Sequence, residues 1–203
     1  SIHMLDWRSP ESSSTIFKSH RGGVTGLDFN PNKPNVLATS GMDGFVKFWD
    51  TRYASSSVQA NSNSNTNSNN RKLQRPLFMA RGGHRHWSSC VKYNPSHDQL
   101  VLSAGTDAIV NLWRVSTISS APLLALNTPT NASTMAGASG ATNDDDNSDA
   151  SGPNVRVGYH EHMDSIYSVA WGHCDPWMFA SVGLDGKLYV HHVPSKEKYK
   201  ILL

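Results

Sequence analysis

The clearest pattern of apolar and polar positions lies in residues 37–52, whose sequence is LATSGMDGFVKFWDTR. Two short apolar runs flank the triplet Met42-Asp43-Gly44, and the second run ends at Trp49-Asp50. Apolar runs of this length on either side of turn-forming residues are typical of β-strands joined by a tight turn. The stretch therefore predicts a β-hairpin.

The same arrangement recurs twice more along the chain and predicts three units of antiparallel strands. The expected inner strands are Val24–Phe29, Val36–Ser40 and Phe45–Trp49, then Ser89–Tyr93, Leu100–Ala104 and Ile109–Trp113, then Ser165–Trp171, Met178–Val182 and Lys187–His191. The expected outer strands are Leu77–Ala80, Val155–Tyr159 and Tyr199–Leu203. An alternative for the last position is a strand that comes from a preceding part of the protein. Residues Ser1–Asp6 and Thr15–Lys18 are expected to end an earlier unit.

Four polar or aromatic residue types keep fixed intervals within these units. The sets are His20, Thr39, Asp43 and Trp49; His84, Ser103, Asp107 and Trp113; and His162, Ser181 and Asp185, with His191 in place of the Trp. An indole only donates hydrogen bonds and an ionised carboxylate only accepts them, so a chain from Trp through hydroxyl and His to Asp satisfies every member. This repeat resembles the blades of WD40 proteins, in which such a chain stiffens each blade. We expect a looser chain around His191.

The same residue types also occur in hydrolases, where His, Ser or Thr, and Asp form a nucleophilic triad. Here the set recurs at one spacing, each of the first two sets includes a Trp that a triad does not need, and the G-x-S-x-G motif is absent from the sequence. These features favour a structural role over a catalytic one.

The repeats predict an all-β fold, a WD40 β-propeller with three complete four-stranded blades and part of a preceding blade. The expected boundaries are 1–19 for the partial blade, then 20–83, 84–160 and 161–203. Propellers typically have four to eight blades, so we expect this chain to form the C-terminal part of a larger, seven-bladed propeller. The alternative is a very short propeller that closes by association.

Two stretches of low complexity interrupt the blades. Residues 55–70 are rich in Asn and Ser, and residues 128–153 contain the acidic run NDDDNSD. Neither stretch has enough apolar side chains to offset the entropy of ordering, so we expect disordered insertions. The acidic run is interpreted as a solvated loop, with docking or phosphorylation at Ser148 as the alternative.

Charge and composition exclude several functional classes. The 18 basic and 16 acidic residues nearly balance, which favours neither a nucleic acid nor an anionic membrane as a partner. The two cysteines, Cys90 and Cys174, are far apart and indicate reduced thiols. The sequence contains no apolar run of transmembrane length, so we expect a soluble protein that reaches membranes only through its partners.

Several blade-specific stretches carry a closer resemblance: GLDFNPNKPNVLATSGMDGFVKFWDTR, VKYNPSHDQLVLS, EHMDSIYSVAW, DPWMFAS, LDGKL and KYKILL. Together they are similar to the family of EARP- and GARP-complex-interacting WD-repeat proteins, also called TSSC-type WD40 proteins. The resemblance departs at the two insertions. It implies a non-catalytic adaptor without a cofactor. The implied partner is a multisubunit vesicle-tethering complex, and the implied location is cytoplasmic, peripheral to endosomes and the trans-Golgi network, in endosomal recycling and retrograde traffic.

Partner contacts are expected on the surface where the turns between the second and third strands and the loops between blades emerge. The candidates are Arg21, Met42, His86, Trp87, Thr106, Met163, Asp164 and Leu184. Trp, Met and Arg are enriched at the centres of protein interfaces. The alternative for Trp87 and Met163 is packing between neighbouring blades.

A second binding hypothesis comes from Trp49-Asp50-Thr51-Arg52, which resembles the W-D-x-R element of substrate receptors of cullin-4-type ubiquitin ligases. In this alternative Asp50 and Arg52 would contact the ligase adaptor. A metal site is not expected, because the histidine pairs lack further ligands at zinc spacing. Nucleic-acid binding is not expected either, because Lys196, Lys198 and Lys200 have no aromatic stacking platform.

Overall fold

The computed structural model describes residues 1–56, 75–121 and 154–202 and confirms an all-β fold of antiparallel sheets. The first sheet has the order β1 (Ile2–Asp6), β2 (Ser9–Ile16), β6 (Ser55–Ser56). The second has β3 (Val24–Phe29), β4 (Val36–Gly41), β5 (Val46–Asp50), β7 (Phe78–Ala80). The third has β8 (Ser88–Tyr93), β9 (Leu100–Gly105), β10 (Val110–Val115), β11 (Asn154–Tyr159). The fourth has β12 (Ile166–Trp171), β13 (Met178–Gly183), β14 (Leu188–His192).

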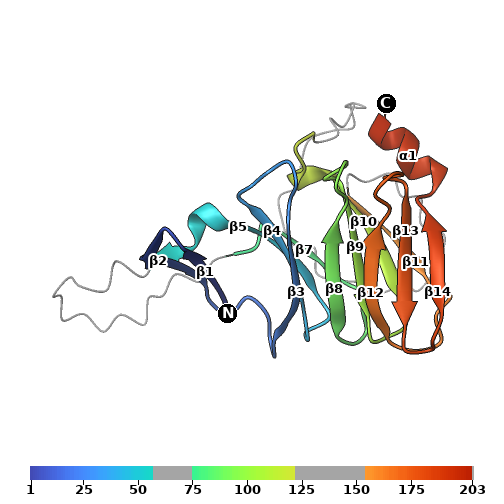
Figure 1. Ribbon diagram of the computed structural model, residues 1–203, viewed down its shortest axis with the longest axis horizontal. Helices are drawn as coiled ribbons and strands as arrows, with labels where there is room; N and C mark the ends of the chain where they lie inside the picture. Colours follow the sequence, from blue (N-terminus) through green and yellow to red (C-terminus); the bar gives the residue numbers. More distant parts are fainter. Residues whose placement is uncertain (57–74, 122–153, 203) are drawn as a thin grey trace, which may run out of the picture.

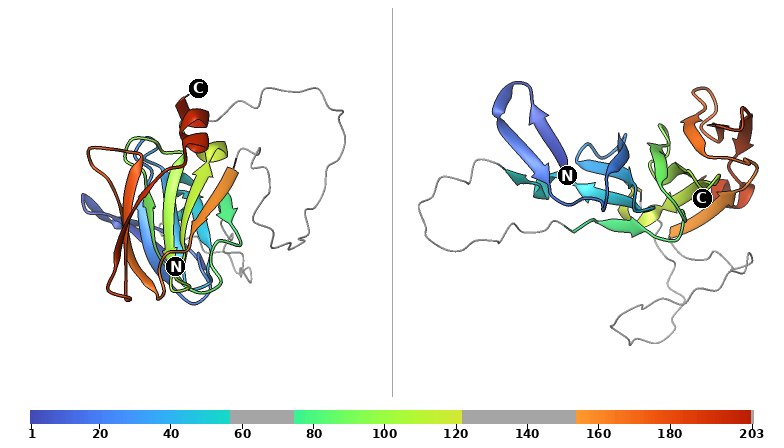
Figure 2. Two further views of the ribbon diagram at one scale, coloured as in Figure 1. Left: turned by 90° about the vertical axis from the view of Figure 1, so that its right-hand side faces the viewer. Right: turned by 90° about the horizontal axis from the view of Figure 1, so that it is seen from below.

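The sheets stand side by side in chain order and do not close into a ring (Figures 1 and 2). Their inner strands β3, β8 and β12 are neighbours, and hydrogen bonds cross between them: the Thr25 hydroxyl donates to the carbonyl of Ser88, and the Ser89 hydroxyl donates to that of Ile166 at 2.8 Å. The number of blades in a closed propeller stays a prediction.

The hydrophobic core lies between the faces of successive sheets. The central strands of the second and third sheets are buried along their whole length, because a neighbouring sheet covers each of their two faces. These strands are β4, β5, β9 and β10. Phe48 of the second sheet packs edge-to-face on Tyr93 of the third, with ring centroids 6.1 Å apart. A second core joins the third and fourth sheets, where Leu102 and Phe179 are fully buried. Central strands covered on both faces explain the continuous apolar runs in the sequence.

The first sheet differs from the sequence prediction at two places. Strand β2 begins at Ser9, not at Thr15, and Ser55–Ser56 form the strand β6 instead of starting a disordered insertion. The carboxylate of Asp50 accepts the amide of Arg52 and caps a 3-10 helix over Thr51–Tyr53, which directs the chain back to β2. The rest of the 55–70 insertion lies outside the described residues, as do the 128–153 insertion and Ser148.

The prediction of an outer strand at Tyr199–Leu203 is wrong, because the chain forms the helix α1 over Ser195–Leu202. The carbonyl of Pro194 accepts the amides of Glu197 and Lys198 and starts the helix. Its Lys, Glu and Leu residues are good helix formers. The fourth sheet therefore has three strands among the described residues, not four, and β14 pairs there only with β13.

An ion pair holds α1 against the third sheet. The Nε atom of Arg114, on β10, donates to Oε2 of Glu197 at 2.5 Å, and both side chains are buried. Ile201 lies four residues after Glu197, on the same side of the helix, and packs on the core between the third and fourth sheets. The helix follows the fourth sheet in the sequence but is bound to the third sheet.

The three hairpin turns place the residue after each Asp in the left-handed region. Gly44 and Gly186 have φ of +73° and +72°, values that glycine adopts without steric cost. In the third sheet this position is Ala108, with φ of +63°. An alanine there is strained by contact of its Cβ with the backbone.

Replacement of Ala108 by Gly is expected to stabilise the protein by about 0.5–1 kcal/mol, because it removes this strain at a smaller cost in unfolded-chain entropy. The midpoint of urea unfolding measures the change. Gly186→Ala is the reciprocal control, since a Cβ at that position meets nothing within 4 Å and only the φ angle opposes it. A loss of stability in Ala108→Gly would contradict the analysis.

Replacement of Glu197 by Gln is expected to destabilise the protein by about 3 kcal/mol, because it removes the carboxylate that pairs with the buried guanidinium of Arg114 at 2.5 Å. Urea unfolding again provides the measurement. Lys200→Ala is the control, since its ammonium lies 3.8 Å from Glu197 and is partly exposed; we expect a loss below about 1 kcal/mol. Equal losses in the two variants would contradict a dominant Arg114–Glu197 pair.

Candidate partner-binding surfaces

A buried hydrogen-bond chain joins the four predicted residues of the second sheet. The indole Nε1 of Trp49 donates to the hydroxyl of Thr39 at 2.8 Å, and this hydroxyl lies 2.7 Å from Nε2 of His20. The other ring nitrogen, Nδ1, lies 2.7 Å from Oδ1 of Asp43. A neutral imidazole protonated at Nδ1 satisfies all three bonds, since Nε2 then accepts the Thr39 proton.

The electrostatics of this chain agree with a neutral histidine. Burial lowers the pKa of His20, and the neighbouring carboxylate of Asp43 only partly offsets the effect. Burial also opposes ionisation of Asp43, but hydrogen bonds from Lys47, His20 and the amide of Arg21 lower the pKa of its carboxyl below the ordinary value. Asp43 is thus an anion held by several donors, and it fixes the loop before β3 to the β4–β5 turn.

The third and fourth sheets repeat the chain with small differences. His84 contacts Ser103 at 2.8 Å and Asp107 at 3.1 Å, and Trp113 donates to Ser103 at 2.9 Å. In the fourth sheet, Nε2 of His162 lies 2.9 Å from the hydroxyl of Ser181, and Nδ1 of His162 lies 3.1 Å from the carboxylate of Asp185.

His191 takes the place of tryptophan in the fourth sheet. Its Nε2 lies 3.0 Å from the hydroxyl of Ser181 and serves as the donor. Burial lowers its pKa and favours this neutral form. The ring stacks on Phe179 at a centroid distance of 4.9 Å, so an aromatic contact accompanies the hydrogen bond. The Asp185 contacts, at 3.1 and 3.2 Å, are longer than the 2.7 Å of the second sheet but close to the 3.1 Å between His84 and Asp107 in the third, so a looser chain around His191 stays a prediction.

Sequence reasoning missed one further position in each network, the fourth residue after the turn Asp. Lys47 donates to Asp43 and to the carbonyl of Ser19, both at 2.8 Å. Asn111 donates to the carbonyl of Gly83 at 2.7 Å, and Tyr189 packs edge-on against His162 at 4.7 Å. The spacing was available in the sequence, but three different residue types stand there and hide the repeat.

The hydroxyl groups of Thr39, Ser103 and Ser181 are buried, with at most 1% of each residue exposed. A nucleophile in these positions has no access to a substrate. The geometry therefore suits a scaffold, and the three sets hold loops in place at one end of the sheets.

Loops and turns of neighbouring sheets contact one another at this end of the molecule, which Figure 2 (right) views end-on. The Ser165 hydroxyl of the fourth sheet donates to the carbonyl of Thr106 in the third at 3.2 Å. A Cβ built on Gly44 would lie 2.9 Å from the carbonyl oxygen of His86, so the second-sheet turn abuts the loop before β8. The turns and loops of three sheets thus form one continuous surface.

Four large apolar side chains are exposed on this surface, and we call them the loop row. They are Met42, Trp87, Met163 and Leu184, with exposed fractions of 41, 45, 85 and 68%. Trp87 stacks on His86 with centroids 5.3 Å apart, and both its ring and Met163 reach solvent instead of filling the space between sheets.

The other predicted surface residues surround the loop row. Arg21, His86 and Asp164 are exposed, and Thr106 is half-buried. The amide of Arg21 donates to Asp43, and the ring of His86 bonds the hydroxyl of Thr106. These backbone and side-chain bonds fix the loops, so the row is held in a defined arrangement.

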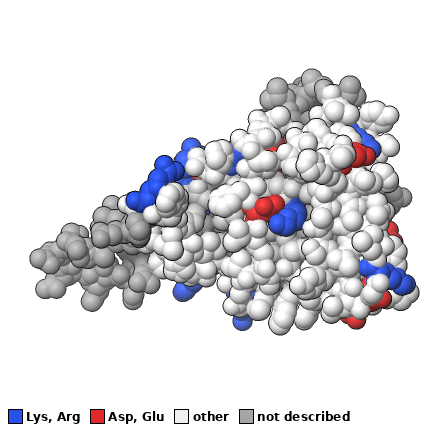
Figure 3. All heavy atoms as spheres, viewed as in Figure 1, with Lys and Arg blue, Asp and Glu red and all other residues white. Residues whose placement is uncertain are grey.

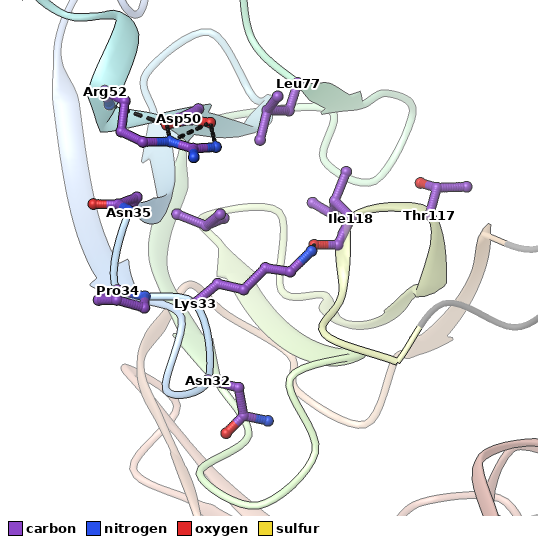
Figure 4. A pocket seen from close by; sticks show the side chains of 10 residues that line it. Asn32, Lys33, Pro34, Asn35, Asp50, Arg52, Leu77, Thr117 and Ile118 are labelled. Atoms are coloured by element: carbon purple, nitrogen blue, oxygen red, sulfur yellow. Dashed lines mark hydrogen bonds and ion pairs between the residues drawn. The ribbon is translucent and has the colours of Figure 1, made fainter.

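A second surface lies at the opposite end of the sheets. Basic side chains gather along the upper left of the molecule in Figure 3, above the 3-10 helix at Thr51–Tyr53 and the β3–β4 loop. There a hollow of about 430 Å³ is lined by Asn32, Lys33, Pro34, Asn35, Val36, Asp50, Arg52, Leu77, Thr117 and Ile118 (Figure 4). We call it the basic hollow.

The two residues of the predicted W-D-x-R element have different environments in this hollow. Arg52 forms a forked pair with Asp50, with bonds of 2.9 Å from Nε and 2.6 Å from Nη2, and its side chain is 64% exposed. The hydrogen bonds from Arg52 lower the pKa of Asp50, which is itself buried. Asp50 therefore orients Arg52, and Arg52 alone of the two reaches outward.

The described residues include no group of three or more His, Cys, Asp or Glu side chains arranged to hold a metal ion. Both ring nitrogens of His84 and of His162 are within hydrogen-bond distance of the network residues. In the described ranges, no helix has the length and apolar character needed to cross a bilayer.

Comparison with known proteins identifies two matching family models. The model described as EIPR1 beta-propeller matches residues 1–113, and the model described as WD domain, G-beta repeat matches residues 153–192.

Three relatives illustrate the similarity. "EARP and GARP complex-interacting protein 1" of Homo sapiens is 37% identical over 98% of this chain and 45% of its own length. "EARP-interacting protein 1" of Caenorhabditis elegans is 32% identical over 98% of the chain and 47% of its own length. "WD repeat-containing protein DWA2" of Arabidopsis thaliana is 28% identical over 95% and 44%. The chain spans about half the length of these relatives.

Stability is expected to fall as the pH drops below about 6.5, the ordinary pKa of histidine, because folding lowers the pKa of His20 and His191. Below pH 6.5 the unfolded chain binds more protons than the folded chain. The contribution of these histidines to the free energy of unfolding is therefore largest above pH 6.5 and decreases as the pH falls toward their folded-state pKa values. His191→Gln keeps an N–H donor for Ser181 and removes one titration, so the slope should decrease by at most about 1.4 kcal/mol per pH unit.

Urea unfolding between pH 7.5 and pH 5 measures this slope. His173→Gln serves as the matched control, because His173 is exposed and lies outside the networks. An unchanged slope in His191→Gln would contradict a role for this ring in the pH dependence.

Proposed function

Because this chain belongs to the EIPR1 beta-propeller family, we propose that it is a non-catalytic adaptor that binds a multisubunit vesicle-tethering complex of the EARP or GARP type. The names of its relatives, which describe interaction with these complexes, support the proposal. The adaptor acts in endosomal recycling and retrograde traffic. It is cytoplasmic, and its partners bring it to endosomes and the trans-Golgi network.

The observation that carries this function is the loop row. Single exposed apolar residues are common on protein surfaces, but Met42, Trp87, Met163 and Leu184 lie on interlocked loops of three adjacent sheets. Clustered large apolar side chains on a rigid support are typical of an interface centre. The buried networks supply that support, so the row meets a partner with little loss of loop entropy.

Purification of the tagged protein from its own cells, followed by mass spectrometry, tests this function. The combined substitution Met42→Ser, Trp87→Ala and Met163→Ser should reduce recovery of tethering-complex subunits at least about tenfold, since interface-centre residues contribute about 2 kcal/mol or more each. Tyr199→Ser is the control, because Tyr199 is also a large exposed side chain, at 62%, but lies on α1. Equal recovery of these subunits by the wild type and by the triple variant would show that the loop row is not part of the interface.

A second candidate function is that of a substrate receptor for a cullin-4-type ubiquitin ligase. The supporting observation is the exposed guanidinium of Arg52, which Asp50 holds in a fixed direction. A fixed arginine suits recognition of a partner's acceptor groups. In this arrangement Arg52 makes the contact and the buried Asp50 only positions it.

The same purification separates the two functions when Arg52→Ala is included. Recovery of tethering-complex subunits by both wild type and Arg52→Ala supports the first function. Recovery of the ligase adaptor by wild type alone supports the second. Recovery of neither partner by wild type would overturn both.

A further inference from the structure

The basic hollow has a ligand chemistry of its own, which shares Arg52 with the second proposed function but requires neither proposed function to hold. Its walls come from the β3–β4 loop and the end of β5 in the second sheet and from the 3-10 helix Ser116–Ile118 in the third. The geometry points to a binding site for a short extended segment of another protein, in which a Glu or Asp side chain is followed by a large apolar residue.

Lys33 and Arg52 line the hollow, and their positive charges favour an acidic side chain in the bound segment. Asp50 is the only carboxylate among the lining residues, and Arg52 already engages it. Lys33 extends across the hollow toward Ile118, and its ammonium donates to that residue's carbonyl at 3.1 Å (Figure 4). An ammonium has three donors, so Lys33 retains capacity for a ligand oxygen. The lining residues carry a net charge of +1, from Lys33 and Arg52 against Asp50.

The preorganisation of Arg52 favours a carboxylate over water. Two of its nitrogens are fixed by Asp50, while 64% of the side chain remains exposed at the rim. An arginine whose direction is already fixed loses little side-chain entropy when a second acceptor binds. Charge-assisted hydrogen bonds to such a group are stronger than neutral ones.

The other walls of the hollow are apolar and favour a large apolar residue next to the acidic residue of the bound segment. Leu77 is 47% exposed, and Ile118 is half-buried beside it. Val36 also lines the hollow, and Figure 4 shows Pro34 on the side away from Leu77. An apolar side chain placed there removes apolar surface from water on both sides. A volume of about 430 Å³ accommodates two or three side chains, not a folded domain.

The hollow and the loop row lie at opposite ends of the same strands. Strand β4 runs from Val36, in the hollow, to Gly41, beside Met42 of the loop row. At about 3.3 Å per residue the two surfaces are about 17 Å apart along the strand. A segment bound in the hollow therefore leaves the loop row accessible to a second partner.

Fluorescence anisotropy with synthetic peptides and the purified protein tests the site. The probe is the labelled peptide Ser-Asp-Glu-Leu-Leu-Ser, compared with Ser-Asn-Gln-Leu-Leu-Ser and Ser-Asp-Glu-Ser-Ser-Ser, all with blocked ends. We expect saturable binding of the first peptide and binding weaker by about tenfold or more for each of the other two. Arg52→Gln and Lys33→Gln should each weaken binding of the first peptide about tenfold.

Lys187→Gln is the matched control, because it removes the same charge from an exposed lysine at the opposite end of the sheets. It should leave binding unchanged. Urea unfolding of each variant separates loss of binding from loss of fold. Absence of saturable binding, equal binding of the three peptides, or equal affinity in Arg52→Gln and wild type would overturn the proposal. Displacement of the peptide by inorganic phosphate at similar concentration would show a plain anion site instead, and would overturn it as well.

Discussion

The structure depends on one interaction above all, the hydrogen bond between a turn carboxylate and a loop histidine. Asp43, Asp107 and Asp185 each accept from a His ring and from the backbone amide that follows that His. One anion therefore ties the entrance of a sheet to its central hairpin. Because the anion is shielded and each donor has a fixed place, the loops are determined as strictly as the strands. The surface proposed for partner recognition rests on this arrangement.

The position four residues after each turn Asp shows how such a network tolerates variation. Lys47 adds a charge to the first network, Asn111 adds a neutral donor to the second, and Tyr189 adds only a ring face to the third. The His–Asp and His–hydroxyl contacts recur in all three networks while this neighbouring residue differs. The contact between His and Asp is 3.1 Å both in the network that contains Trp113 and in the one that contains His191, so the replacement of Trp leaves this contact unchanged.

Much of this arrangement was predictable from the sequence, because each apolar run and each set of His, hydroxyl and Asp residues belongs to a single sheet and recurs at one spacing. Helix α1 was not, since Tyr199–Leu203 is as apolar as a strand and only the distant Arg114 explains why Glu197 faces inward. The basic hollow was also missed. Arg52 follows β5 of the second sheet and Ile118 follows β10 of the third, so they are far apart in the sequence. Only the packing of the two sheets brings them together.

The pairing of α1 with β10 has a consequence for how the protein comes apart. The helix follows the fourth sheet in the chain but is fastened to the third through Arg114 and Glu197. The fourth sheet is therefore enclosed between its own covalent start and an anchored end, and it cannot peel away strand by strand from the C-terminus. Opening of the last two sheets becomes a single cooperative event, so their amides should share one opening free energy in hydrogen exchange.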